Sequence, residues 1–244
     1  MAVLALETTS RTSYVALAEN GAILVERSSA DLRGAEVLAQ LISSALDDGR
    51  LSFDSISEVL VGIGPGSFTG IRTGLAAAAG LRAATGVRLR GVSTLLAGCV
   101  LADPNAACVL PILRANPNES YCCILELEWS SANSKLIVRT LGEVEAVKTE
   151  LIRSEERFQK QNGLPVELLD LDQLSFQHQA PGNSPASVLA RFAYDVDQSR
   201  SIFPQLGVQA AVDGLLPSPL YIKEVHAKTL SERGIERRNP LDIR

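Results

Sequence analysis

Apolar residues dominate three short segments at the start of the chain, "AVLALE" (2–7), "SYVALAE" (13–19) and "AILVERS" (22–28). Short segments with this bias, bounded by turn residues, are typical of β-strands. Asn20-Gly21 separates the last two and is the dipeptide favoured in tight two-residue hairpins. The pattern therefore predicts a three-stranded meander.

The spacing then changes to helices that alternate with strands. Residues 35–48 repeat their apolar positions with a helical period, and Gly49 follows where a C-terminal cap belongs. Residues 56–63 fit a buried strand, 71–85 a second helix and 87–92 a short strand. This order predicts a mixed sheet with helices packed on it, as in ribonuclease-H-like and actin-like folds.

The strand pattern restarts near residue 105, which suggests a duplicated architecture. A helix that begins at Pro185 is expected over 185–196. Further strands are expected at 107–114, 120–128, 135–141, 164–171 and 218–225. We predict a first lobe at 1–104 and a second lobe at 105–244. The second lobe ends in a charged tail, and its last helix could pack against the first lobe.

Composition and charge narrow the class of protein. With 46% apolar and 21% charged residues the chain is globular, and its net charge of −5 gives no overall attraction to nucleic acid. The N-terminus has no basic leader, and the apolar runs are shorter than the roughly 20 residues of a membrane span, so we expect a cytoplasmic protein without a membrane anchor. Two histidines exclude a His-rich metal site, and four irregularly spaced cysteines predict no disulfide framework.

A glycine-rich loop and a hydroxyl-rich turn are the candidate ligand-binding segments. The loop "GIGPGSFTGIRTG" (62–74) joins a strand to a helix, a geometry that presents backbone N–H groups to an anion. It matches neither a dinucleotide nor a phosphate-loop motif, so a tight structural turn is the alternative. The residues that would lie near a nucleotide are Glu7, Thr8, Thr9, Ser10, Gly64, Gly66 and Ser67. A nuclease would need further carboxylates at the neighbouring strand ends, and none stands there.

The second helix carries small residues at regular spacing. Gly66, Gly70, Gly74 and Ala78 recur every four residues, which places them on one side of a helix. A surface of this kind lets another helix approach closely, either a neighbour in the same chain or a helix of a partner.

Several segments together resemble one protein family. "LALETTS", "GIGPGSFTGIRTG", "GVSTL" and "SPLYIK" occur in the order and spacing found in the TsaB (YeaZ) family of bacterial tRNA threonylcarbamoyladenosine (t6A) biosynthesis proteins. The resemblance covers most of the chain and is strongest over 2–98. The chain departs from the usual family pattern at Glu7, where Asp is common, at Ile63, and at Arg114-Ala115-Asn116.

The resemblance implies an α/β protein with an actin-like (ASKHA) fold of two ribonuclease-H-like lobes, each a mixed sheet with helices packed on it. It implies a non-catalytic scaffold that binds and stabilises the TsaD transferase subunit in the t6A complex, which the TsaE ATPase joins. It places ATP or ADP and the metal on the partner subunits, predicts no cofactor on this chain, and gives only indirect contact with tRNA. The chain alone would form a homodimer.

In the resembling family the two helices of the first lobe contact TsaD, and here they correspond to 35–48 and 69–84. The expected interface residues are Leu38, Leu41, Ile42, Ala45, Gly70, Arg72, Gly74, Ala77, Ala78 and Leu81. No catalytic and no metal-binding residue is expected. The alternative is an actin-fold ATPase or kinase that uses Glu7 and the glycine loop for its own nucleotide chemistry.

Overall fold

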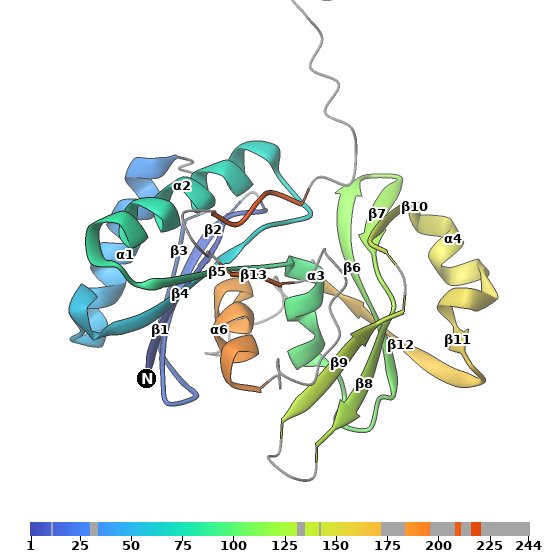
Figure 1. The fold of residues 1–244 in the computed structure, drawn as a ribbon. Helices are drawn as coiled ribbons and strands as arrows, with labels where there is room; N and C mark the ends of the chain where they lie inside the picture. The colour runs from blue at the N-terminus through green and yellow to red at the C-terminus, as the bar shows by residue number, and fades with distance from the viewer. Residues whose placement is uncertain are drawn as a thin grey trace, which may run out of the picture.

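The computed structural model describes residues 1–10, 12–29, 34–130, 135–141, 143–171, 184–195, 208–210 and 216–220. These residues form two mixed β-sheets, with helices on the outer face of the first sheet and between the two sheets (Figure 1). This arrangement confirms the predicted α/β fold class.

The first sheet has the strand order β13-β5-β4-β1-β2-β3. Its strands are β1 (Ala2–Glu7), β2 (Ser13–Glu19), β3 (Ala22–Ser29), β4 (Ile56–Gly62), β5 (Arg88–Val92) and β13 (Val208–Ala210). β1 pairs antiparallel with β2 and parallel with β4, so the predicted meander and mixed sheet are confirmed. Asn20 and Gly21 both have positive φ, 51° and 88°, which is the turn geometry that matches the twist of a hairpin.

The second sheet repeats the order of four strands of the first sheet. Its strands are β6 (Cys108–Asn116), β7 (Glu119–Cys122), β8 (Leu125–Trp129), β9 (Leu136–Thr140), β10 (Glu145–Lys148), β11 (Lys160–Gln161) and β12 (Leu164–Asp170). The order β10-β7-β6-β12 corresponds to β3-β2-β1-β4, with the first pair of strands antiparallel and the last parallel in both sheets. The two sheets therefore share a ribonuclease-H-like topology.

One predicted strand is two strands in the structure. Residues 120–128 break at Cys123, because β7 pairs with β6 from Ile112 onward while β8 pairs with β6 only at Cys108 and Val109. Pro111 lies in the gap between these two pairings and has no N–H to donate to a ladder. The prediction of one continuous strand was wrong for this reason.

Helices lie on the outer face of the first sheet, between the two sheets, and beside the second sheet (Figure 1). They are α1 (Ala35–Gly49), α2 (Phe68–Thr85), α3 (Thr94–Ala97), α4 (Thr149–Ser154) and α6 (Pro185–Asp195), with short 3₁₀ turns at Phe53–Ser55, Gly98–Leu101 and Glu156–Phe158. The left-handed residue that ends α1 is Arg50 and not Gly49, which is still helical. Of the predicted strand at 218–225, only 218–220 are described, and they lie outside the sheets, although the Leu220 N–H donates to the Ile63 carbonyl at 2.8 Å.

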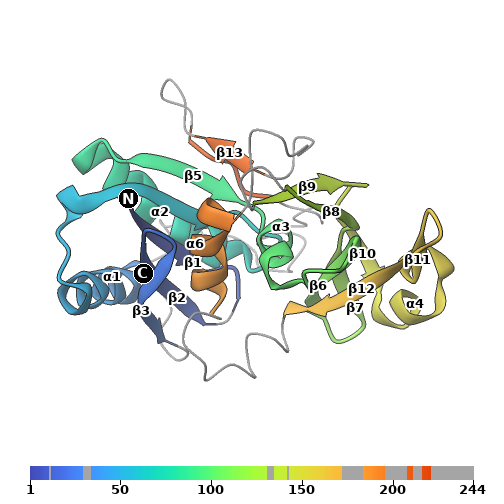
Figure 2. The same ribbon diagram turned by 90° about the horizontal axis from the view of Figure 1, so that it is seen from below.

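Alternate residues of β1 separate two cores. Leu4 and Leu6 pack toward α1 and α2, whereas Val3 and Ala5 pack in a core that α3, α6 and residues of both sheets share. Figure 2 shows α3 and α6 between the two sheets. One core therefore joins both halves of the molecule.

Helix α6 is fastened to the first sheet at both ends. At its start the Glu26 carboxylate of β3 accepts hydrogen bonds from the Ser184 N–H, at 3.0 Å, and from the Ser187 hydroxyl. Near its end the Tyr194 hydroxyl donates to the Met1 carbonyl at 2.7 Å.

Candidate functional site

The hydroxyl-rich turn after β1 and the glycine loop after β4 meet at one edge of the first sheet. The Ser67 N–H donates to the Thr9 carbonyl at 2.6 Å, and the Thr8 hydroxyl donates to the Gly70 carbonyl at 2.7 Å. The parallel pairing of β1 with β4 explains this meeting, because parallel neighbours end on the same side of a sheet. The two turns are far apart in the sequence, and the fold brings their residues together in one cluster.

Close backbone approach explains two of the glycines in the loop. A Cβ atom on Gly66 would stand 2.4 Å from the Thr9 carbonyl oxygen, and the φ of Gly66 is 157°. A Cβ atom on Gly70 would stand 1.9 Å from the Thr8 carbonyl oxygen. Any larger residue at either position would push the loop away from the turn.

Glu7 lies at the centre of this cluster and is buried, with 1% of its surface exposed. Its Oε1 accepts a hydrogen bond from the Thr9 N–H at 2.7 Å, and its Oε2 accepts one from the Thr94 hydroxyl at 2.9 Å. Burial raises the pKa of Glu7, and the hydrogen bonds from Thr9 and Thr94 oppose that rise. The carboxyl group thus links the turn after β1 to the start of α3.

The polar groups of the cluster bond mainly to one another. The Thr9 and Ser67 amides, which a bound phosphate would need, already donate to Glu7 and to Thr9. Gly64 turns the chain at φ 105°, and the Ser67 hydroxyl caps α2 by accepting from the Gly70 N–H at 3.2 Å. Ser10 is exposed and donates to the Thr12 carbonyl at 2.9 Å. The contact of these residues with a nucleotide stays a prediction.

Most of the predicted interface residues point into the protein. A Cβ atom on Gly74 would stand 2.4 Å from the Thr8 hydroxyl oxygen and 3.3 Å from the Val61 side chain. The residues that pack against their own sheet or the turn after β1 in this way are Leu38, Ile42, Ala45, Gly70, Gly74 and Ala78. Their assignment to a partner surface is corrected here, since the first sheet needs these faces of α1 and α2 as its cover.

A second row of α2 residues faces outward instead. Arg72, Ala76, Gly80 and Ala84 are all exposed, and a Cβ atom on Gly80 would meet no atom within 4 Å. We call these four residues the outer strip. Of the remaining predicted positions, Leu41, Ala77 and Leu81 are half-buried at the border of the core. The outer strip has the same four-residue spacing as the row of small residues predicted from the sequence. The spacing was therefore visible in the sequence, but the side of α2 that faces outward was not.

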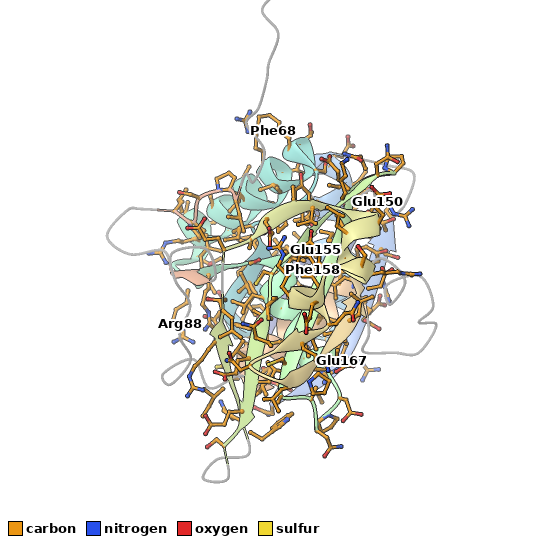
Figure 3. The ribbon with its side chains drawn as sticks, turned by 90° about the vertical axis from the view of Figure 1, so that its right-hand side faces the viewer. Phe68, Arg88, Glu150, Glu155, Phe158 and Glu167 are labelled. Carbon is orange, nitrogen blue, oxygen red and sulfur yellow. The ribbon has the colours of Figure 1, made fainter. Side chains whose placement is uncertain are left out.

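The N-terminal end of the outer strip carries one stacked pair. The Arg72 guanidinium lies over the Phe68 ring, 3.8 Å from the ring centre. Figure 3 shows Phe68 at the periphery of the molecule, at the start of α2. The pair gives the strip a flat, cationic edge beside its small residues.

The potential metal ligands and the cysteines are scattered through the described ranges. Within them, no group of three or more His, Cys, Asp or Glu side chains could hold a metal ion. The four cysteines are buried and are not in disulfides, and burial raises the pKa of Cys122 and of Cys123 to about 12. His178 and His226 lie outside the described residues. No helix in the described part of the chain is long and apolar enough to cross a membrane.

Comparison with known proteins finds matches among families of tRNA modification. The family model of TsaD, the tRNA N6-adenosine threonylcarbamoyltransferase, matches residues 28–153. The TsaB protein of t6A biosynthesis in Escherichia coli is 30% identical over 96 residues, which are 39% of this chain and 42% of that protein. An uncharacterized protein of Mycobacterium tuberculosis is 38% identical over 96 residues, 38% of this chain and 46% of that protein. The chain thus spans less than half the length of the curated relatives it matches.

Solved structures share the fold. YeaZ from Pseudomonas aeruginosa superimposes with a TM-score of 0.56 at 19% identity, over 83% of this chain and 99% of that one. A second structure from that organism, described as similar to peptidase YeaZ, gives a TM-score of 0.61 at 20% identity, over 91% and 99%. The arrangement of two sheets is therefore that of YeaZ.

Proposed function

Because the chain belongs to the TsaD family of tRNA N6-adenosine threonylcarbamoyltransferases, as a TsaB (YeaZ) homologue, we propose that it is a non-catalytic subunit that binds and stabilises a TsaD-type transferase. The transferase would carry the metal and perform the chemistry on tRNA, and a TsaE-type ATPase would join the complex. In this proposal the chain contributes binding energy that favours the active conformation of its partner.

The observation that carries the proposal is the outer strip of α2. Small side chains with open space above them allow the backbone of a second helix to approach closely, and Gly80 offers this most clearly. Helix α1 lies beside α2 and adds exposed small residues at Ala39 and Ser43. The two helices together suit a helix-to-helix interface, and the TsaD family match includes both of them.

The hydrogen bonds within the polar cluster are consistent with a subunit that does not itself turn over a nucleotide. Glu7 is buried and bonded within the chain, and the glycine loop lies against the turn after β1. In this proposal ATP or ADP and the metal bind to the partner subunits, and tRNA reaches this chain only through them. An obligate interface of this type buries about 2,000 Å² or more, and the same helices would pair two copies of the chain when the partner is absent.

A reconstitution that omits one component at a time tests the proposal. The mixture holds the TsaD-type and TsaE-type subunits, the enzyme that forms threonylcarbamoyl-adenylate, and tRNA, with or without this chain. We expect t6A to form only when the chain is present, and the chain alone to leave ATP and tRNA unchanged. Equal formation of t6A without the chain would refute the scaffold role. ATP turnover by the chain alone, lost in Glu7→Ala, would favour the ATPase or kinase instead.

A further inference from the structure

Residues 216–220, which we call the strap, lie at the end of β4 and against β5, far from these strands in the sequence. The Leu220 N–H donates to the carbonyl of Ile63, the residue directly after β4, at 2.8 Å. Pro217 and Leu220 are buried, whereas Leu216 is exposed. In Figure 1 the strap is the red segment that runs beside α2. The chain therefore places one of its last described segments next to the helix that carries the outer strip.

Gly91 of β5 leaves room for Pro217. A Cβ atom on Gly91 would stand 2.7 Å from the Cβ atom of Pro217 and 2.5 Å from the Ile63 side chain. Because side chains alternate along a strand, Gly91 shares a face of β5 with Leu89, which packs in the core under α1 and α2. Pro217 therefore extends the cover that these helices give to the outer face of the first sheet.

Gly64 receives the other end of the strap. A Cβ atom on Gly64 would stand 3.0 Å from the Leu220 carbonyl oxygen and 2.9 Å from the side chain of Ile71, which belongs to the first turn of α2. With its φ of 105°, Gly64 has a backbone conformation that residues with a side chain rarely adopt. The strap, the glycine loop and the start of α2 therefore meet at one residue.

Three hydrogen bonds hold the chain where β4 passes into the glycine loop. The Ile63 N–H donates to the Val92 carbonyl at 3.0 Å, and the Thr94 N–H donates to the Gly64 carbonyl at 2.9 Å. The third is the bond from the Leu220 N–H of the strap to the Ile63 carbonyl. Release of the strap would remove this donor and uncover Gly64, just before the chain turns into α2.

The middle of α2 is held independently of the strap. Thr8, in the turn after β1, contacts Gly70 and Gly74. These contacts remain when the strap is released, so its release should loosen the start of α2 without detaching the helix. The start of α2 carries the stacked pair of Arg72 and Phe68, at the N-terminal end of the outer strip.

We propose that the strap is a latch that regulates partner binding. When it is seated, it fixes the glycine loop and the start of α2 in the position at which the outer strip meets a partner helix. When it is released, the start of α2 takes this position for only part of the time, and affinity falls by that fraction. This inference rests on the proposed function, because the surface that the latch regulates is the one that binds the TsaD-type subunit.

Leu220→Ala tests the latch, with Leu216→Ala as the matched control. Both substitutions shorten a leucine of the strap, but Leu220 is 5% exposed and Leu216 is 49% exposed. In full-length Leu220→Ala we expect amide hydrogen exchange, measured by NMR, to be about ten-fold faster in residues 67–72, with a smaller change in α1 and α6. Leu216→Ala should leave exchange unaltered in all three segments.

Calorimetric titration with the TsaD-type subunit measures the regulation. We expect Leu220→Ala to bind about ten-fold more weakly than the unchanged chain, as for a start of α2 that is in place about a tenth of the time. Leu216→Ala should bind as the unchanged chain does. Equal affinity of the two variants, or an equal acceleration of exchange in all three segments, would overturn the latch. If the unchanged chain itself does not bind, the proposed function is refuted, and the latch with it.

Gly91→Ala displaces the strap without changing its sequence, and it serves if Leu220→Ala does not fold. Its methyl group would collide with Pro217 and with Ile63. The Leu220 amide should then exchange faster, together with residues 67–72, and partner affinity should fall as in Leu220→Ala. Weaker partner binding with a Leu220 amide that exchanges as slowly as in the unchanged chain would show that the strap does not mediate the effect, and the proposal would fail.

Discussion

The Thr8 hydroxyl fits against the bare Cα of Gly74, and a Cβ atom on Gly74 would stand only 2.4 Å from its oxygen. The same hydroxyl donates to the Gly70 carbonyl at 2.7 Å. Helix α2 is therefore seated on the turn after β1 through its glycines. This contact fixes which side of α2 faces the protein and which side faces outward.

Gly74→Ala and Gly80→Ala should have opposite effects on stability. The first adds a methyl group where Thr8 and Val61 leave no room, and we expect the free energy of unfolding to fall by about 1–3 kcal/mol. The second adds the same group in open space within the helix, and should raise that free energy by about 0.5–1 kcal/mol. Urea denaturation of both variants measures the difference, and effects of equal sign would contradict the assigned direction of α2.

Ala76→Arg should block partner binding without harm to the fold. Ala76 is exposed in the middle of the outer strip, so a long side chain there keeps a second helix at a distance. We expect affinity for the TsaD-type subunit to fall about ten-fold or more, with stability within about 0.5 kcal/mol of the unchanged chain. The control is Ala22→Arg, which makes the same change at an exposed alanine of β3. Calorimetric titration of both variants decides, and unchanged binding by Ala76→Arg would remove the strip from the interface.

Glu7 should make stability fall as the pH rises. Burial raises its pKa above the ordinary value of 4.5, so the folded chain holds this proton more tightly than the unfolded chain. Its contribution is fully present below about pH 4.5 and is lost as the pH rises through the raised pKa. Glu7→Gln cannot titrate, so it should lack this part of the pH dependence. Urea denaturation of both proteins across a pH series from 4.5 upward measures this, and parallel curves would contradict it.

Glu26→Ala should loosen α6 from the first sheet. The Glu26 carboxylate accepts hydrogen bonds at the start of α6 from the Ser184 N–H and from the buried Ser187 hydroxyl. Their loss is expected to lower the free energy of unfolding by about 1–2 kcal/mol. Hydrogen exchange should be faster in 185–195 than in the unchanged chain. Ser28→Ala, an exposed position on the same strand, serves as the control and should leave exchange in α6 unaltered.

The local sequence pattern was sufficient to predict most elements. It failed where the end of a strand depends on which other strand it pairs with. The strands 2–7, 13–19 and 22–28 and the helix 35–48 were predicted nearly to the residue, because short apolar segments, the Asn20-Gly21 turn and helical spacing are properties of neighbouring residues. The break at Cys123 escaped prediction, because it depends on which part of β6 each segment pairs with. The meeting of Thr9 with Ser67 is likewise a consequence of parallel strands that are far apart in sequence.

The amino-acid sequence by itself determined the order of the elements, the family and the presence of a row of small residues on α2. Only the tertiary structure decided which of two such rows packs inward. Gly70, Gly74 and Ala78 lie two residues away from Arg72, Ala76 and Gly80, and two residues turn an α-helix by roughly 200°. Because small residues occur on both sides of α2, its sequence holds little contrast between an inner and an outer face. The contact with Thr8, supplied by a distant turn, sets the direction.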